Sequence, residues 1–492
     1  MEAPSLSRVR LWIGCGIGAL SAAGCQDTAG VPKPAPPSVT ALSLQANPFN
    51  ALSTVATFQI HQADSARLSC APENGGPASE TPAYPVTDSA QRIAALGLLP
   101  ATRYECRVAA LGPGGSSTSE SVAYDVAALP TSLSGVHLDI TGAPTSGYIL
   151  TEVSRDTEAF AVAFDSTGNV RWYRGFPASA AGAAADIDQQ PNGAFTLYVG
   201  ASTGWQPTAG SYYEFRPDGE LIRTYSAGAP YYTDPHELRL TTQGTTATTA
   251  LWFGYNLRVV DLTALGGRAD QQVAGHSVLR QSDSAAPVFI WNAWDHFSIA
   301  DWVFVPPGLS AYPSIDFDHP NSLAIDRDGN YVVSFAMPGE IAKIDATTGQ
   351  FIWRLGGRHN QFTIMGDPLN GFGFQHDVRI LDNGDLLFYD NGLMHSPPQS
   401  RAVEYRLDTS HMTATLVWEY RHAPPVFTPF VGTVERLGDG STLVGFAAAD
   451  LLDMVTPDGQ LVWEGRVTID GQPVPYFYRA RRIRSLYGYT EP

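Results

Sequence analysis

The sequence predicts an all-β protein in which an immunoglobulin-like β-sandwich precedes a six-bladed β-propeller. The 492 residues include 47 Gly, 36 Pro, 10 Trp, 21 Tyr and 22 Phe, a mixture typical of short strands joined by tight turns. Runs of alternating apolar and polar residues recur along the chain, and helical periodicity is nearly absent. Hydrophobic residues make up 44% and charged residues 16%, which excludes a disordered chain or a coiled coil.

The chain is acidic, with 48 Asp and Glu against 30 Lys and Arg and a formal net charge of −18. A surface of this sign repels the phosphates of DNA and RNA, so we expect no nucleic-acid partner. A small anionic ligand needs only a local positive site, and the net charge does not exclude one.

Residues 1–24 are expected to form a signal peptide. Arg8 and Arg10 precede the uncharged run Leu11–Ala23. This run is too short to cross a bilayer, because a spanning helix needs about 20 residues. It ends at Ala22-Ala23-Gly24-Cys25, which resembles the lipobox of bacterial lipoproteins and implies that Cys25 is lipidated. Ordinary cleavage near the same alanines is the alternative.

The export signal predicts a protein of the cell envelope. We expect an outer-membrane lipoprotein that faces the periplasm or the cell surface and contacts the membrane through its lipid anchor alone. Residues 25–37 are rich in Pro and are expected to form a semi-rigid tether between the anchor and the folded domains.

Residues 38–130 are expected to form the sandwich, because their apolar residues alternate with period two. The segment Leu99-Pro100-Ala101-Thr102-Arg103-Tyr104 resembles strand F of fibronectin type III domains, in which a Leu-Pro turn leads to a Tyr of the core. This resemblance places Cys70 and Cys106 on neighbouring strands. An oxidising compartment would allow them to bond, and two buried thiols are the alternative. We expect this domain to provide contact or spacing and no chemistry.

Residues 131–492 repeat a unit of strand, turn and strand. The turns contain Asp or Asn followed by Gly, which supplies the positive φ angle of a hairpin turn, and the second strand often carries Trp. Clear copies are residues 163–173, 214–221, 343–353 and 454–463. A chain of this length divides into six to eight four-stranded blades, and we predict six. A short helix is expected near Asn292–Trp302.

Three histidines are the candidate functional residues of the propeller. His236, His319 and His376 each precede an apolar strand that is followed by a turn, so we assign them to equivalent positions of three repeats. The innermost strands of a propeller surround a central channel, where such residues converge. A single histidine is more often a structural hydrogen-bonding group, but three equivalent copies favour function.

The propeller resembles the bacterial arylsulfotransferases, which need no nucleotide sulfate donor. The resemblance covers most of residues 131–492 and none of the sandwich. The matching segments are Asp234-Pro235-His236-Glu237, Asp318-His319-Pro320-Asn321-Ser322, Ile352-Trp353-Arg354-Leu355-Gly356-Gly357, Gln375-His376-Asp377, Phe388-Tyr389-Asp390-Asn391-Gly392 and residues 478–487. It implies a six-bladed propeller that moves a sulfuryl group from an aryl sulfate to a phenol, with no cofactor and no metal.

The resemblance also implies the site residues. His376 matches the nucleophile that attacks sulfur and forms a sulfohistidine in a ping-pong reaction. His319 and His236 match residues that bind the sulfuryl oxygens and exchange a proton with the phenolic oxygen, and Asn321 is expected to contact the substrate. The chemistry is reasonable, because sulfuryl transfer mainly requires positioning and charge stabilisation, and neutral imidazole is a good nucleophile near pH 7.

The sequence departs from the family pattern after the His319 strand. The family has a Ser-Arg pair whose arginine contacts the sulfate, whereas Ser334 is followed here by Phe335. Arg358 is the nearest candidate for a replacement. The departure favours an alternative, namely a catalytically inactive, envelope-anchored propeller that binds a ligand or a protein. A third hypothesis is a quinone-dependent dehydrogenase, although such propellers are usually larger and richer in Trp repeats.

Overall fold

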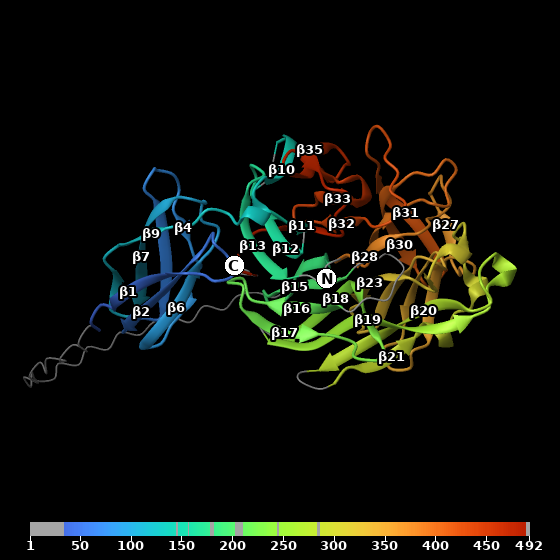
Figure 1. The fold of residues 1–492 in the computed structure, drawn as a ribbon, viewed down its shortest axis with the longest axis horizontal. Helices are drawn as coiled ribbons and strands as arrows, with labels where there is room; N and C mark the ends of the chain where they lie inside the picture. Colours follow the sequence, from blue (N-terminus) through green and yellow to red (C-terminus); the bar gives the residue numbers. More distant parts are fainter. Residues whose placement is uncertain are drawn as a thin grey trace, which may run out of the picture.

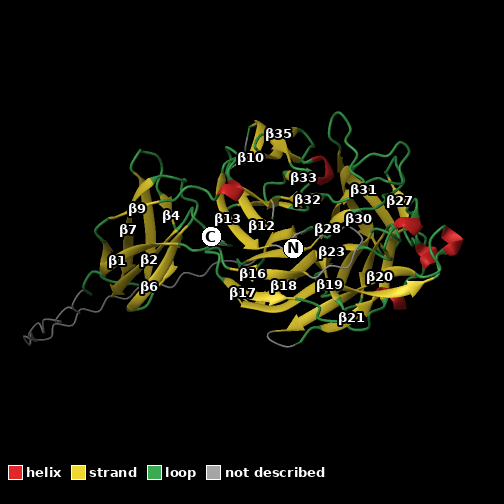
Figure 2. Ribbon diagram, viewed as in Figure 1, coloured by secondary structure: helices red, strands yellow, loops and turns green. Residues whose placement is uncertain are grey.

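The computed structural model describes residues 34–488, apart from 144–145, 156, 178–181, 202–209, 244–245 and 283–285. The expected signal peptide, Cys25 and most of the tether lie outside the described residues. Within them the chain forms strands and short 3₁₀ helices without any α-helix, and no helix there is long and apolar enough to cross a membrane. The predicted all-β class is confirmed, as Figure 2 shows.

The N-terminal part of the described chain is a pair of antiparallel sheets (blue in Figure 1). One sheet contains β1 (Ser38–Ala46), β2 (Thr54–His61) and β6 (Ser89–Ala95). The other contains β3 (Ser65–Pro72), β4 (Ser79–Glu80), β5 (Tyr84–Pro85), β7 (Arg103–Gly112), β8 (Gly115–Thr118) and β9 (Val122–Asp125).

The paired sheets enclose a core that includes Tyr104, whose hydroxyl accepts a hydrogen bond from the Leu99 backbone at 2.9 Å. Cys70 of β3 and Cys106 of β7 lie directly opposite each other and are joined by a disulfide. The Leu-Pro turn therefore does lead to a core Tyr, as expected from the sequence.

Six further sheets follow in residues 136–483. The first sheet contains β11 (Tyr148–Arg155), β12 (Glu158–Phe164), β13 (Val170–Pro177) and β37 (Ala480–Ile483). The second sheet contains β14 (Gly182–Gln189), β15 (Phe195–Ala201), β16 (Gly210–Phe215) and β17 (Leu221–Tyr225). The third sheet contains β18 (Tyr232–Gln243), β19 (Thr246–Val260), β20 (Gln271–Ser282), β21 (Val288–Asn292) and β22 (Ser314–Asp316). The fourth sheet contains β23 (Pro320–Ile325), β24 (Tyr331–Phe335), β25 (Glu340–Ile344) and β26 (Phe351–Gly356).

The last two sheets complete the set. The fifth sheet contains β27 (Thr363–Met365), β28 (His376–Ile380), β29 (Leu386–Asp390), β30 (Arg401–Asp408) and β31 (Thr413–Tyr420). The sixth sheet contains β10 (Val136–Gly142), β32 (Thr433–Arg436), β33 (Thr442–Phe446), β34 (Leu451–Val455), β35 (Leu461–Ile469) and β36 (Gln472–Pro473).

The 3₁₀ helices are η1 (Thr131–Leu133), η2 (Thr263–Leu265), η3 (Ala293–Asp295), η4 (Ile299–Asp301), η5 (Leu309–Ala311) and η6 (Ala447–Ala449). The helix expected near Asn292–Trp302 is thus two separate 3₁₀ turns.

The six sheets form a closed ring. The strand at one end of each sheet contacts its counterpart in the next sheet, in the order β37, β14, β18, β23, β28 and β32, and β32 contacts β37 to complete the circle. These strands therefore surround a central axis, which is the arrangement of a propeller. Side chains at the start of these strands can meet although they are far apart in the sequence.

Both ends of the propeller sequence take part in closing the ring. The C-terminal strand β37 pairs with β11 and supplies the innermost strand of the first sheet. The N-terminal strand β10 pairs with β35 and supplies the outermost strand of the last sheet. These two pairings link the first and last sheets, because β10 directly precedes the first sheet in the sequence and β37 follows the last one.

Apolar side chains fill the spaces between neighbouring sheets. Trp172 of β13 is fully buried against Phe195 and Phe215 of the following sheet, at ring-centroid distances of 4.8 and 6.2 Å. Burial of a large side chain of this kind contributes about 1.5–3 kcal/mol to stability. The sandwich is held to the same region, because the Leu96 backbone donates to the Tyr487 hydroxyl at 2.8 Å and Arg92 pairs with Asp218 at 2.7 Å.

Candidate active site

The three histidines predicted from the sequence lie together at the starts of the inner strands. The ring centroids of His236 and His319 are 4.6 Å apart, and those of His319 and His376 are 6.3 Å apart. His236 belongs to β18, His319 directly precedes β23, and His376 begins β28. Three consecutive sheets thus each supply one imidazole to a single cluster.

The three histidines are not all at equivalent positions, which corrects the expectation from the repeats. Neighbouring inner strands are linked by hydrogen bonds, in which a backbone N–H group of one strand donates to a side-chain oxygen of the inner strand in the preceding sheet. The bonds are Leu238 N to Asp186 Oδ2, Val378 N to Ser322 Oγ, and Val434 N to Asp377 Oδ2. When the inner strands are aligned by these bonds, His236, His376 and Asn321 occupy the same strand position. His319 lies two residues before that position. A φ of +46° at His319 accompanies this irregular start.

His376 is buried and its two ring nitrogens have different roles. Its Nδ1 lies 2.7 Å from Asn391 Oδ1 and 3.0 Å from the Phe374 carbonyl oxygen. The Asn391 amide cannot be reversed, since its Nδ2 donates to the carbonyl oxygens of Thr428 and Val431 at 2.8 and 2.7 Å. Both neighbours of Nδ1 are therefore acceptors, so Nδ1 carries the proton and Nε2 keeps its lone pair.

The electrostatic surroundings keep His376 neutral. Burial, together with the nearby His319 and His236, lowers the pKa of His376 to about 3. A histidine with an ordinary pKa near 6.5 would be partly protonated at neutral pH. His376 therefore presents a neutral imidazole with an available lone pair, which is the form needed for nucleophilic attack.

His236 and His319 are each oriented by a carboxylate. His236 Nδ1 donates to Asp234 Oδ1 at 2.8 Å, and His319 Nδ1 donates to Asp316 Oδ2 at 2.6 Å. Burial alone would raise the pKa of Asp234, but His236 and His276 lower it well below its usual range, so this carboxyl is ionised. The Nδ1 atom of each ring is thus bound to a carboxylate.

A fourth histidine, His276 of β20, links these two carboxylates. His276 is 1% exposed, and it donates from Nδ1 to Asp318 at 2.9 Å and from Nε2 to Asp234 at 3.1 Å. Its Nε2 also lies 3.6 Å from Asp316. Burial alone would lower the pKa of His276, but the surrounding Asp318, Asp316 and Asp234 raise it well above its usual range. We assign His276 as a buried cation that positions Asp234 and Asp316.

Ion pairs between inner strands hold the same region together. Arg479 is 2% exposed and pairs with Asp186 at 2.8 Å and Glu237 at 3.0 Å, and its Nη2 donates to the His236 carbonyl oxygen. Arg481 pairs with Asp377 at 2.9 Å. Since these arginines come from the C-terminal segment, closure of the ring also fixes the backbone that carries His236. Asp377 pairs with arginine and contacts the next inner strand, so it does not orient the His376 ring.

The remaining predicted site residues are placed differently. Asn321 is fully buried, and its Nδ2 donates to the Gln375 carbonyl oxygen at 2.7 Å, so this amide N–H group links two sheets. Its Oδ1 has no hydrogen-bond partner among the described residues. Arg358 is exposed, and its Nε donates to the Trp302 carbonyl oxygen at 3.0 Å. No hydrogen bond or ion pair within the described residues joins Arg358 to the three histidines.

A family model now identifies the propeller. The model of the arylsulfotransferases (ASST) matches residues 141–468, which contain all four of these histidines. The chain belongs to the arylsulfotransferase family. Membership supports an aryl-sulfate sulfotransferase activity in general terms, with small aryl sulfates and phenols as substrates.

Known structures resemble this family member at low sequence identity. A protein of unknown function from Bacteroides caccae has 13% identity and a TM-score of 0.43, covering 69% of this chain and 100% of that chain. An inactive virginiamycin B lyase from Staphylococcus aureus has 9% identity and a TM-score of 0.34, covering 68% and 89%. Cobalt-substituted Synechocystis ACO has 13% identity and a TM-score of 0.30, covering 90% and 98%. No curated protein matches the chain.

Phe335 occupies the position at which the resemblance led us to expect an arginine. Its side chain is fully buried, with ring centroids 5.3 Å from Trp291 and 5.0 Å from Phe297. The Phe335 carbonyl oxygen accepts a hydrogen bond from Gln375, the residue before His376. The backbone of residue 335 thus supports the site, while its side chain packs in an aromatic core.

Proposed function

We propose that the protein transfers a sulfuryl group from an aryl sulfate to a phenol by a ping-pong reaction through a sulfohistidine on His376. The observation that carries the proposal is the pair of acceptors at His376 Nδ1, Asn391 Oδ1 and the Phe374 carbonyl oxygen, which leaves Nε2 unprotonated. The nearby His319 and His236 offer the proton donors that such a reaction needs.

In the first half-reaction the Nε2 lone pair of His376 attacks sulfur. An N–S bond forms and the bond between sulfur and the aryl oxygen breaks, with its electron pair leaving on that oxygen. His319 or His236, when protonated on Nε2, transfers that proton to the oxygen, and a neutral phenol leaves. His376 is then an N-sulfonated imidazolium that still donates from Nδ1, and the positive charge of its ring is balanced by the negative sulfonate.

The second half-reaction reverses these steps with another phenol. The imidazole that gave up its proton accepts the proton of the incoming hydroxyl, and the phenolic oxygen attacks sulfur. The new S–O bond forms as the N–S bond breaks, and the electron pair returns to His376 Nε2. The enzyme regains its first state, so atoms, protons and charge balance without a cofactor.

The charge on the sulfuryl oxygens must also be stabilised. Nε2–H groups of His236 and His319 can donate to these oxygens, and each ring is held in place by a carboxylate at Nδ1. His276 balances part of the negative charge of these carboxylates, since it lies between Asp234 and Asp316. We propose that this arrangement supplies the local positive site that the acidic chain needs.

A second candidate function is ligand or protein binding without chemistry. Phe335 favours it, because the arginine expected to contact the sulfate is replaced by a buried aromatic side chain. In either case we propose export and attachment to the cell envelope through Cys25, as the N-terminal sequence predicts, with the sandwich as a spacer.

A chromogenic aryl sulfate distinguishes the two functions. We expect the purified protein to release the coloured phenol, and to release it faster when a second phenol is added as acceptor. His376→Gln should abolish release, whereas His411→Gln, a substitution at a surface histidine whose side chain is 77% exposed, should leave the rate unchanged. Lack of release across several donors and acceptors, or an active His376→Gln variant, would rule out the enzymatic proposal.

The covalent intermediate provides a separate test. The protein is mixed with the aryl sulfate in the absence of acceptor, digested, and analysed by mass spectrometry under neutral conditions. We expect a sulfonate adduct on the peptide that contains His376, which disappears after brief acid treatment or addition of a phenol. Turnover without any adduct on His376 would indicate direct transfer between the two substrates.

A further inference from the structure

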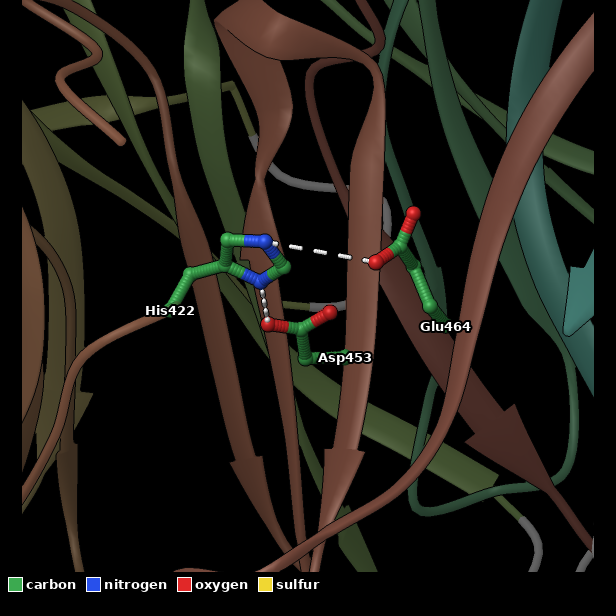
Figure 3. Close-up of side chains that lie close together, drawn as sticks. All are labelled: His422, Asp453 and Glu464. Carbon is green, nitrogen blue, oxygen red and sulfur yellow. Dashed lines mark hydrogen bonds and ion pairs between the residues drawn. The ribbon is translucent and has the colours of Figure 1, made fainter. Parts of the chain in front are cut away.

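A second cluster of titratable side chains lies apart from the three histidines, where two neighbouring sheets meet. His422 follows β31, Asp453 belongs to β34 and Glu464 belongs to β35. Figure 3 shows that the three side chains point toward one another. One potential ligand atom from each residue can be chosen so that all three lie within 4.8 Å of one another.

The hydrogen bonds of Asp453 determine the state of His422. His422 Nδ1 lies 2.8 Å from Asp453 Oδ2, and the Tyr420 hydroxyl donates to the same oxygen at 2.8 Å. Because Oδ2 is an acceptor, Nδ1 carries a ring proton, and Nε2 is the ring nitrogen that can coordinate a cation. A carboxylate behind one nitrogen of a histidine, with the other nitrogen free to coordinate, is a common arrangement at metal sites.

The atoms on the other side of the ring are not hydrogen-bonded to one another. His422 Nε2 lies 4.0 Å from Glu464 Oε2, which is too far for a hydrogen bond. Asp453 is fully buried, and its Oδ1 has no hydrogen-bond partner in the described parts of the chain. In Figure 3 this oxygen points toward the Glu464 side of the cluster. Three potential ligand atoms therefore lie on the same side of the cluster without a hydrogen bond between them, and a shared cation would give each of them a partner.

We propose that His422, Asp453 and Glu464 form a binding site for a divalent transition-metal ion of the Zn²⁺ type. One imidazole nitrogen and two carboxylate oxygens suit this class of ion. Bonds from Zn²⁺ to such atoms are about 2.0–2.2 Å long, so ligand atoms 4.0 Å apart can share one ion. Arg466 approaches the other Glu464 oxygen, Oε1, at 3.5 Å and leaves Oε2 available.

The position of the site indicates what the ion does. His422 follows the outer strand β31 of one sheet, whereas Asp453 and Glu464 belong to the next sheet, so a shared ion cross-links them. The Glu464 side chain is 30% exposed and gives the ion a path from solvent. The site is separate from the histidine cluster and does not depend on the proposed sulfuryl transfer. Its effect is on the stability of the propeller.

The test is Zn²⁺ binding to the untagged mature chain after removal of metals with EDTA. We expect calorimetric titration to show one saturable equivalent, and thermal denaturation to move to a higher temperature with added Zn²⁺. Glu464→Gln and His422→Gln should each weaken binding at least tenfold. Glu464→Gln changes a partly exposed side chain without changing its size, so a near-ultraviolet spectrum equal to that of the parent protein will show retained folding.

His411→Gln is the matched control, because His411 also contacts a carboxylate, Asp408, but lies on the surface. Its affinity for Zn²⁺ should equal that of the parent protein. Absence of stoichiometric uptake would overturn the proposal and leave a simple ion pair between His422 and Glu464. Uptake that both site variants leave unchanged would also overturn it, since the ion would then be bound elsewhere.

Discussion

The Nδ1 atom of His376 lies 2.7 Å from the Oδ1 atom of Asn391, and this contact determines which ring nitrogen carries the proton. Asn391 follows β29, the strand that pairs with the His376 strand, and its own amide nitrogen is bound to two carbonyl oxygens. Its orientation is therefore set by the backbone. A buried amide thus selects the tautomer in which Nε2 is nucleophilic.

Asn391→Leu should impair chemistry more than binding. The substitution keeps a similar volume but removes one acceptor at Nδ1, so the ring is free to turn or to place its proton on Nε2. We expect kcat to fall roughly 10²-fold, by comparison with other enzymes in which a histidine loses its orienting partner, while KM changes little. Steady-state kinetics with a chromogenic donor measure both constants. Asn383→Leu, in the exposed turn after β28, is the control, and equal effects of the two variants would contradict the prediction.

The lowered pKa of His376 predicts a pH-dependent contribution to stability. The folded-state pKa is about 3, whereas an unfolded histidine titrates near 6.5. Between these values the unfolded state binds more protons, so the free energy of unfolding falls as pH falls through this window. Gln at position 376 cannot bind this proton. Relative to His376→Gln, the parent protein should lose about 2 kcal/mol between pH 7 and pH 5.

Urea unfolding of the two proteins at both pH values measures this difference. Groups common to both proteins, such as the carboxylates near His276, cancel when the variant is subtracted. A difference between parent and variant that stays constant from pH 7 to pH 5 would show that folding does not lower the pKa of His376, and it would remove this support for a neutral nucleophile.

Much of the fold was visible in the sequence because local chemistry produces it. The Asp-Gly and Asn-Gly turns mark the hairpins, and the alternating runs between them became strands. Closure of the ring could not be predicted from the sequence. It depends on the pairing of β37 with β11, which lie at opposite ends of the propeller sequence, and no local sequence pattern indicates that pairing. Arg479 and Arg481 were noticed as part of a family-like segment, but their pairing with Asp186 and Asp377 follows only from closure.

The site was predictable where a motif contained the functional side chain. His236, His319 and His376 stand before apolar strands, and the structure brings all three together. His276 was missed, because it lies inside the apolar strand β20, where a histidine resembles a core residue, and Asp234 and Asp318 are each 42 positions away in the sequence. His422 was missed because its partners, Asp453 and Glu464, come from two later strands.

His276→Gln should weaken catalysis without removing any group that reacts. The variant loses the cation between Asp234 and Asp316, so both carboxylates hold the rings of His236 and His319 less well. Loss of a buried ion-pair partner also destabilises a protein by about 3–5 kcal/mol. We therefore expect a lower unfolding temperature, and a pH–rate profile displaced relative to the parent protein.

The displaced profile is the informative measurement, because a purely structural defect lowers the rate equally at every pH. Asp234→Asn tests the same link from the other side. If His276 and Asp234 both act through His236, their effects should overlap. The fold-loss of activity in the double variant should then be smaller than the product of the fold-losses in the two single variants. Independent effects that simply multiply would show that His276 and Asp234 do not act as a unit.

Phe335→Arg restores the residue type that the family resemblance led us to expect, yet it should not improve the enzyme. The Phe335 side chain lies between Trp291 and Phe297, so an arginine there would place a charge among aromatic rings. The carboxylate of Glu340, which lies opposite residue 335 on the neighbouring strand, is already paired with Arg354. Burial of an unpaired charge costs several kcal/mol. We expect a large loss of thermal stability and no decrease in KM for the aryl sulfate. Phe335→Leu, which keeps an apolar side chain, should retain most of the activity, since Gln375 contacts only the backbone of residue 335. A clear gain in kcat/KM for Phe335→Arg would instead mean that the side chain can reach the sulfate, and that its replacement by Phe had weakened an ancestral site.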